Sequence, residues 1–177
     1  SITARFQGIG CMLRSVAAFV FHARFPLILR MHHYDVLIIG SGLAAATLAL
    51  SLPASMKVLV ATKKAPEDSS SYWAQGGIEA VMGNDASFAA HVLDTLVAGA
   101  GLCNEAVVRR VVEAAPDAMR WLIDQGVPFD LEGGEYHLTR EGGHSRRRIL
   151  HSRDATGRAV QDILLARLRA RENVTLL

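Results

Sequence analysis

The stretch Gly40-Ser41-Gly42-Leu43-Ala44-Ala45 constrains the fold more than any other feature of the sequence. It follows the apolar run 34–39 and opens a segment rich in alanine and leucine, so the order predicts strand, glycine turn and helix. Gly40 would permit the tight turn, and Gly42 would let a pyrophosphate approach the backbone at the start of the helix. Ala45 stands where a third glycine is usual and is small enough for close packing. The pattern favours a dinucleotide-binding turn over an ordinary turn of another doubly wound sheet.

The rest of the chain alternates between apolar strands and amphipathic helices. We expect a helix over 43–52, a strand over 57–61 and a helix from Asp85 to about Ala98. A further helix begins at Asn104, and a new helix begins at Pro116 and ends at Gly126. A hairpin over 129–137, turning at Gly133-Gly134, a last helix capped by Asp154 and Thr156, and a strand over 173–177 complete the predicted order. The fold class is therefore α/β, a Rossmann-like domain whose βαβ layout ends unfinished on a strand.

Apolar side chains at helical spacing are expected to face the core. They are Phe88, Val92, Leu96 and Val97 in the first long helix, Val107, Val108, Val111 and Val112 in the next, Met119, Trp121 and Leu122 after Pro116, and Val160, Ile163, Leu164 and Leu168 near the end.

A chain of 177 residues, half of them apolar, is long enough for one domain with a substantial core. The formal net charge of +2 is unevenly spread, because residues 1–30 hold four arginines and no acidic residue. Without those four, 15 basic residues face 17 acidic ones. A nearly neutral body argues against nucleic acid as the main partner.

The sequence has no apolar run close to the ~20 residues of a membrane span. Its two cysteines, Cys11 and Cys103, form neither a disulfide framework nor a metal-ligand spacing. We therefore expect no metal site, no membrane span and a reducing, cytoplasmic location.

Residues 1–30 form a segment of their own, acid-free and partly apolar, with a composition compatible with a transit peptide or a poor signal sequence. The alternative is upstream sequence read through ahead of a start at Met31. We favour the alternative because the first strand begins three residues after Met31 and the chain starts with Ser1. Either way, we expect residues 1–30 to lie outside the fold, which takes up residues 31–177.

The end of the second predicted strand bears on which nucleotide binds. Nicotinamide enzymes commonly place an acidic residue there to hold a ribose hydroxyl. This chain reads Ala61-Thr62-Lys63-Lys64, and its first acidic residue is Glu67. The NAD interpretation is weakened, and a lysine there would instead pair with phosphate or bind the adenosine part of FAD.

A segment of small residues, with two aromatics and a diglycine, follows this strand. Its serine hydroxyls and glycine amides can donate hydrogen bonds to a flat ligand at close range, although composition alone would favour a plain surface loop. The segment is Ser69-Ser70-Ser71-Tyr72-Trp73-Ala74-Gln75-Gly76-Gly77.

A second polar constellation lies between the predicted hairpin and the last helix, in the segment 138–148. One carboxylate, Glu141, sits among five cationic or potentially cationic side chains and beside the diglycine Gly142-Gly143. Arg146 to Arg148 fit a solvated charge run, but Glu141, two glycines and His144 in succession are unusual for a mere surface turn.

Six segments of the sequence closely resemble the L-aspartate oxidase family, which belongs to the succinate dehydrogenase and fumarate reductase flavoprotein superfamily. The similarity covers Tyr34 to Leu177 in the same order and spacing. The segments are 35–42 (DVLIIGSG), 72–78 (YWAQGGI), His91-x-x-Asp94-Thr95, 121–126 (WLIDQG), 138–145 (LTREGGHS) and 154–157 (DATG).

The resemblance implies a domain that binds FAD and continues, in the family, into capping and helical domains absent from these 177 residues. It implies that Glu141 orients the substrate and that FAD is held non-covalently, because Ser70 stands where the dehydrogenase and reductase flavoproteins carry the histidine bonded to FAD. The implied FAD contacts, together with the glycine turn, are Gly40, Ser41, Gly42, Leu43, Ala44, Lys63, Ser70, Ser71, Tyr72, Trp73, Ala74, Gln75, Gly76 and Gly77.

The implied reaction transfers hydride from the α-carbon of L-aspartate to the flavin and gives iminoaspartate. Oxygen or fumarate then accepts the electrons, and the product passes to quinolinate synthase in de novo NAD synthesis. The superfamily relatives carry an apolar aromatic residue in place of Glu141. A carboxylate there would attract the α-ammonium group of L-aspartate and repel succinate.

Two rival interpretations stay open at this point. The first is a catalytically incomplete FAD-binding fragment, because the family's remaining arginines and histidines come from later segments. The second is a fumarate- or succinate-directed relative, against which Glu141 and Ser70 argue. His144 and Arg140 have only weak claims to a role at the site.

Overall fold

The computed structural model of the protein describes residues 32–82 and 87–177. The chain divides into two compact units, 1–33 and 34–177, and the architecture below is that of the second unit. The expectation for residues 1–30 concerns positions outside the described residues.

A three-stranded parallel sheet begins the fold. β1 (Val36–Ile39) pairs with β2 (Val58–Ala61), and β2 pairs on its other edge with β8 (Val174–Leu176). Val36 lies opposite Val58, and Val58 opposite Val174. Short apolar runs suit such strands because the faces of a parallel sheet are normally covered. The predicted strands are confirmed.

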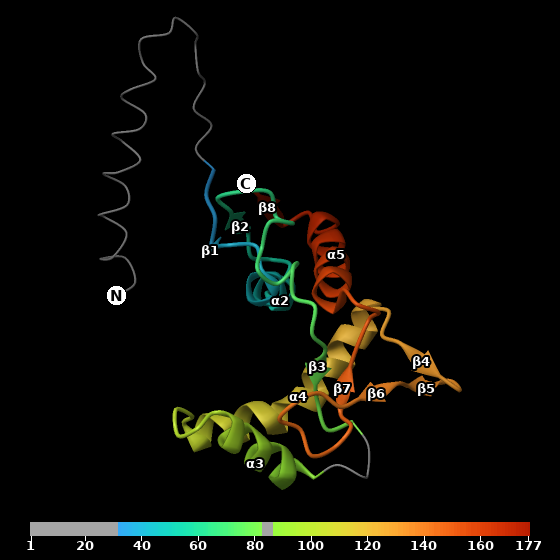
Figure 1. Ribbon diagram of the computed structural model, residues 1–177. Helices are drawn as coiled ribbons and strands as arrows, with labels where there is room; N and C mark the ends of the chain where they lie inside the picture. The colour runs from blue at the N-terminus through green and yellow to red at the C-terminus, as the bar shows by residue number, and fades with distance from the viewer. Residues whose placement is uncertain (1–31, 83–86) are drawn as a thin grey trace, which may run out of the picture. The chain divides into compact units, whose positions relative to one another are not determined.

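Two helices pack against each other beside this sheet (Figure 1), namely α2 (Leu43–Ser51) and α5 (Thr156–Arg169). The small side chains Ala46 and Ala49 are fully buried on α2, which lets α5 approach closely. α5 buries its own apolar stripe, including Val160, Leu164 and Leu168. The core of the unit therefore begins between the sheet and this helix pair, and it continues to buried side chains further along the chain, such as Met119 and Leu150. The predicted α/β, Rossmann-like fold is confirmed.

The second part of the unit consists of two further helices and short antiparallel strands. α3 (Phe88–Ala98) packs on α4 (Glu105–Gln125). β3 (Ile78–Glu79), β7 (Ile149–Leu150) and β6 (Leu138–Thr139) form a sheet in that order. β4 (Leu131–Glu132) and β5 (Glu135–Tyr136) form the predicted hairpin, with Gly133 and Gly134 both at positive φ.

The prediction of a new helix at Pro116 is wrong, because α4 runs unbroken from Glu105 to Gln125. Proline in a helix interior removes one backbone hydrogen bond and crowds the preceding turn. Here Pro116 is buried on the same face as Val112, Met119 and Leu122, and burial of this face offsets the loss. Both ends of α4 are as predicted, with Asn104 capping its start and Gly126 left-handed at its end.

Two predicted helix starts also differ from the structure. α3 begins at Phe88 behind the N-cap Ser87, whereas the prediction began it at Asp85, a residue outside the described ranges. α5 has no side-chain cap from Asp154 or Thr156. The Thr156 hydroxyl instead accepts a hydrogen bond from the Ser152 amide, at 3.1 Å, in a buried position.

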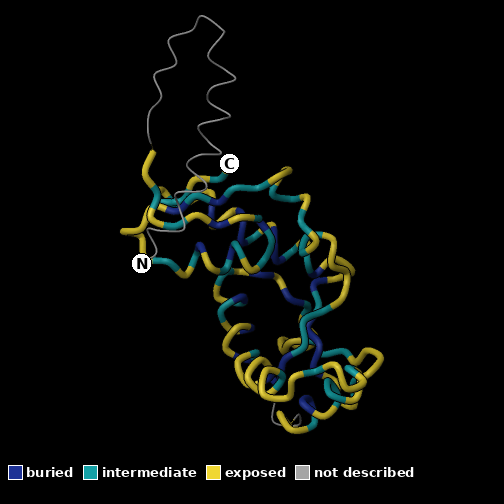
Figure 2. Tube along the Cα trace, turned by 90° about the vertical axis from the view of Figure 1, so that its left-hand side faces the viewer, coloured by how far each residue is buried: buried dark blue, intermediate teal, exposed yellow. Residues whose placement is uncertain are grey.

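The predicted apolar stripes of α3 and α4 are only partly correct. Val92 and Val112 are buried, but Val97, Val107 and Val111 each expose more than half of their surface. Exposed positions cover much of the outer face of these helices, coloured yellow in Figure 2. Periodicity identifies a possible apolar face, but the position of the neighbouring helix decides which part of it is buried. Phe88 is likewise exposed, Val108 and Leu96 are intermediate, and Trp121 packs against the core as predicted.

Candidate functional site

The turn between β1 and α2 has the geometry that the glycine pattern predicts. Gly40 adopts φ +103°, a conformation that L side chains rarely adopt, and its amide bonds to the Ala61 carbonyl at 2.8 Å. Gly42 is the N-cap of α2, which has no side-chain cap and no acidic residue in its first turn. The Leu43 amide donates to the Ser71 hydroxyl, which leaves the next amides, those of Ala44 and Ala45, to face an anionic group, the arrangement that binds phosphate at helix N-termini.

The side chain of Ser41 fixes this turn to the end of β2. Ser41 is buried, and its hydroxyl lies 3.3 Å from Thr62 Oγ1 and 3.3 Å from the Pro66 carbonyl oxygen. The Ser41 carbonyl accepts a hydrogen bond from the side-chain amide of Gln161 on α5. The glycine turn is therefore held by β2 and α5 together.

The serine-rich segment crosses the start of α2. The Ser71 hydroxyl accepts a hydrogen bond from the Leu43 amide at 3.1 Å. A Cβ atom on Gly42 would lie 3.2 Å from the same hydroxyl oxygen, so glycine suits this close approach. The segment is thus packed against the glycine turn and is not a detached surface loop.

The N-terminus of α5 meets the same segment. The Gly157 amide donates to the Ala74 carbonyl at 3.0 Å. A Cβ atom on Gly157 would lie only 2.1 Å from the Ser71 carbonyl oxygen and 2.7 Å from that of Ala74. Only glycine fits here without moving the segment. The Ala74 carbonyl thus satisfies one amide in the first turn of α5, a helix whose N-cap residue, Ala155, offers no side-chain cap.

The start of α2, the serine-rich segment and the N-terminal part of α5 line a cavity of about 180 Å³. Gln161 lines it, is fully buried, and its Oε1 atom has no hydrogen-bond partner among the described residues. A buried acceptor without a partner is unusual in a folded protein and suits a ligand that brings a donor. The cavity is lined by Leu43, Ser71, Ala74, Gly76, Gly77, Ile78, Thr156, Gly157, Val160 and Gln161.

Five of the predicted cofactor residues thus line one cavity: Leu43, Ser71, Ala74, Gly76 and Gly77. Gly40, Ser41, Gly42 and Ala44 form the adjoining turn and helix start. The remaining predicted residues do not line it. Lys63, Ser70, Trp73 and Gln75 are exposed, and the Tyr72 ring lies under the Arg158 guanidinium, 5.8 Å from its Cζ atom.

Glu141 lies in the connection between β6 and β7, with about half of its side chain exposed. Its Oε1 atom is 3.3 Å from Nε2 of His151, the residue that follows β7. The carboxylate is therefore accessible to a ligand and already has a cationic or hydrogen-donating neighbour. His151 was missed by the sequence analysis, since no pattern links it to Glu141.

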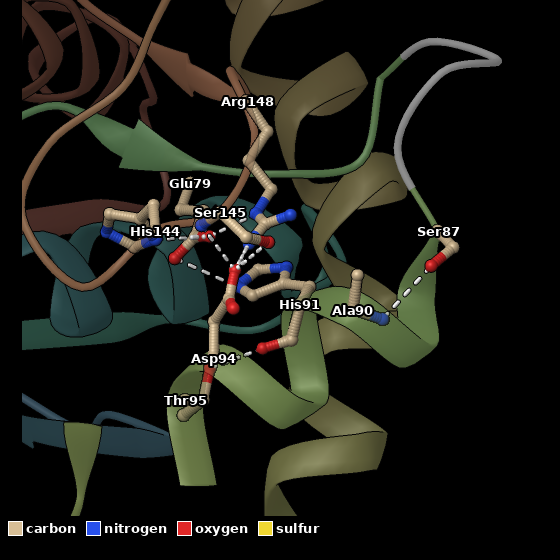
Figure 3. A network of polar contacts seen from close by, with 9 residues as sticks. All are labelled: Glu79, Ser87, Ala90, His91, Asp94, Thr95, His144, Ser145 and Arg148. Carbon is tan, nitrogen blue, oxygen red and sulfur yellow. Dashed lines mark hydrogen bonds and ion pairs between the residues drawn. The ribbon is translucent and has the colours of Figure 1, made fainter. Parts of the chain in front are cut away.

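A network of polar contacts holds the segment that follows Glu141 (Figure 3). Asp94 on α3 accepts hydrogen bonds from the Ser145 amide at 2.8 Å and from its hydroxyl at 2.7 Å. Oε1 of Glu79, on β3, lies 2.7 Å from Nδ1 of His144. Arg148 is completely buried and bonds to both carboxylates. The expectation of a solvated arginine run is therefore wrong for Arg148, which immediately precedes β7 and is completely buried.

Two pKa values in this network are displaced. Hydrogen bonds from Ser145, its backbone amide above all, lower the pKa of Asp94, and Arg148 lowers it further. Burial lowers the pKa of His91, whose Nε2 lies 2.9 Å from Oε2 of Glu79, although the charge of Glu79 acts in the opposite direction. Asp94 is thus held as a carboxylate and His91 is favoured as the neutral ring.

The comparisons with known proteins agree with this geometry. A family model described as "FAD binding domain" matches residues 35–177. The chain belongs to this family of FAD-binding domains. FAD is therefore confirmed as the cofactor, and the turn, the cavity and the buried acceptor of Gln161 fit such a group.

Curated relatives are also similar in sequence. L-aspartate oxidase 2 of Ralstonia nicotianae is 54% identical over 141 residues, which cover 80% of this chain and 26% of the relative. L-aspartate oxidase of Pseudomonas aeruginosa is 51% identical over 154 residues, or 82% of this chain and 29% of the relative. The resemblance predicted from the motifs is confirmed. The chain spans about a quarter of the length of these relatives.

Among solved structures, E. coli quinol fumarate reductase FrdA superimposes with a TM-score of 0.75 at 28% identity. The match covers 81% of this chain and 25% of that chain. Across residues 32–82 and 87–177, no helix combines the length and apolarity needed to cross a membrane.

Proposed function

We propose that this chain supplies the FAD-binding part of an L-aspartate oxidase, which converts L-aspartate to iminoaspartate as the first step of de novo NAD synthesis. The observation that carries the proposal is the half-exposed carboxylate of Glu141. The segment that bears it is held a few residues later by contacts of His144 with Glu79 and of Ser145 with Asp94. The identities of 54% and 51% to L-aspartate oxidases support it, since the fumarate reductase match has 28%.

Glu141 supplies the chemical selection between two similar substrates. L-aspartate differs from succinate by one α-ammonium group, and a carboxylate forms a charge-assisted hydrogen bond with that group. The same carboxylate would face only negative charges in succinate, so it selects by attraction and by repulsion. Its partial exposure leaves it accessible, and the clamp on His144 and Ser145 limits where it can move.

The residues around the cavity would hold the cofactor. The Ala44 and Ala45 amides at the start of α2 suit the pyrophosphate, and Ser71, Gly76 and Gly77 line the cavity. Lys63 remains a candidate for the adenosine end. FAD, when bound, supplies the acceptor for the hydride that leaves the substrate.

Several finer parts of the proposal rest on the resemblance. Ser70 cannot form the histidine–flavin bond, so FAD should be non-covalent. Oxygen or fumarate would accept the electrons, and quinolinate synthase would consume the product. A cytoplasmic location follows from the cysteine content alone and stays a prediction.

The function can be tested in a complete enzyme. Residues 34–177 would replace the matching segment of L-aspartate oxidase 2 of Ralstonia nicotianae, and the chimera would be loaded with FAD. We expect oxidation of L-aspartate, followed by oxygen uptake, and little oxidation of succinate. A chimera that binds FAD but oxidises succinate as fast as L-aspartate would contradict the proposal.

A further inference from the structure

His151, the residue beside the Glu141 carboxylate, is held more firmly than Glu141 itself. His151 follows β7 directly, and both β7 residues, Ile149 and Leu150, are at most 2% exposed. The His151 carbonyl accepts a hydrogen bond from the Asp130 amide at 2.8 Å. Only 18% of the His151 side chain is exposed, against 49% for Glu141. The position of His151 is therefore fixed by its backbone and burial, and the more exposed Glu141 carboxylate lies beside it.

The ring of His151 also contacts the cofactor segment. A Cβ atom on Gly77 would lie 2.8 Å from Cε1 of His151, so the ring sits directly on this glycine. Gly77 lines the cavity assigned to the cofactor. His151 thus lies between the substrate-orienting carboxylate and the diglycine, and links two parts of the site that are 64 residues apart in sequence.

The contact has a consequence for the carboxylate's two oxygens. Nε2 of His151 faces Oε1 of Glu141 at 3.3 Å. A donor beside one oxygen restricts the rotation of the carboxylate and leaves the other oxygen to accept from a second donor. For an α-ammonium group, a carboxylate held in advance costs less ordering on binding than one that is free to rotate.

We propose that His151 is a positioning residue for the substrate: it holds Oε1 of Glu141 so that Oε2 is presented to the substrate ammonium group beside Gly77. This inference rests on the proposed function and adds a residue to it. It predicts that loss of the imidazole donor weakens recognition of an amino-dicarboxylate and spares a dicarboxylate without the amino group.

The first test uses kinetics in the FAD-loaded chimera with three variants. His151→Leu keeps the bulk and removes the donor, and His151→Gln keeps a donor near the position of Nε2. His137→Leu is the matched control, because His137 makes a similar contact to Glu132, at 3.6 Å, on the exposed hairpin. We expect His151→Leu to raise KM for L-aspartate about tenfold while fumarate reduction changes by less than about twofold.

Rescue separates positioning from mere packing. His151→Gln should restore KM to within about threefold of the parent chimera, and His137→Leu should leave it unchanged. Equal losses of L-aspartate oxidation and fumarate reduction in His151→Leu, or a glutamine variant as impaired as the leucine variant, would overturn the positioning role. The proposed function would survive that result, whereas a parent chimera inactive on L-aspartate would overturn both.

The second test needs no turnover. In the 177-residue chain, nitrogen-15 NMR of the imidazoles reports the environment of each histidine. Glu141→Gln should shift the His151 Nε2 signal and leave that of His137 in place. A His151 signal that does not respond would show that the two side chains make no contact, and would overturn the inference.

Discussion

Asp94 accepts two hydrogen bonds from Ser145, one from its amide at 2.8 Å and one from its hydroxyl at 2.7 Å. The two residues lie 51 positions apart, so the contact ties α3 to the segment that carries Glu141. Asp94 also bonds to the completely buried Arg148. One carboxylate thus holds a loop and balances a buried charge.

Asp94→Ala should lower the free energy of unfolding by about 3 kcal/mol, because it leaves the Arg148 guanidinium buried without one of its two carboxylates. Urea unfolding of the 177-residue chain, followed by circular dichroism, measures this change.

Asp117→Ala provides the control for this measurement. Asp117 pairs with Arg120 on α4, with 84% and 60% of their side chains exposed. Such a surface pair contributes about 0–1 kcal/mol, so this variant should unfold almost like the parent. Equal destabilisation by both substitutions would contradict the buried clamp.

The pH dependence of stability should carry a contribution from His91. Its pKa is lowered in the folded chain, chiefly by burial, so the unfolded chain binds the proton first as the pH falls through about 6.5. The free energy of unfolding should therefore decrease below that pH. His91→Gln removes the titrating group, and the difference in unfolding free energy between parent and variant should shrink from about pH 7 to about pH 5.

A parent-minus-His91→Gln difference that stayed constant or widened on acidification would contradict the neutral, buried ring.

Gly157→Ala should weaken FAD binding about tenfold or more, because overpacking at this contact must displace the Ser71–Ala74 backbone. Quenching of flavin fluorescence gives the dissociation constant. Gly142→Ala is the matched control, since a Cβ atom there meets nothing within 4 Å. If both variants bound FAD equally, the close approach at α5 would not belong to the cofactor site.

The flavin should be released by acid precipitation, because Ser70 has no nucleophilic nitrogen to form a covalent bond to FAD. The supernatant should contain all the flavin absorbance, and the pellet none. A pellet that stays yellow after washing would rule out the non-covalent assignment.

The parts of the fold that were predicted correctly depend on short-range chemistry. The turn at Gly40, the cap at Asn104, the end at Gly126 and the hairpin at Gly133-Gly134 are each decided by a few neighbouring residues. The same holds for the short parallel strands, whose apolar runs are bounded by turn residues.

The parts that were missed depend on distant neighbours. Arg148 follows two exposed arginines and differs from them only because Glu79 and Asp94 reach it from 69 and 54 positions away. Pro116 stays helical because its face is buried. The motif 154–157 gives no reason for a glycine at position 157, because the requirement comes from the Ser71 and Ala74 carbonyls, which are distant in sequence.

The recognition of an ammonium group by Glu141 is tested most directly by Glu141→Gln in the FAD-loaded chimera. Glutamine keeps the size and removes the charge, so kcat/KM for L-aspartate oxidation should fall about 10- to 100-fold, whereas fumarate reduction should change by less than about twofold. An equal loss of both activities, or no loss of L-aspartate oxidation, would contradict the account.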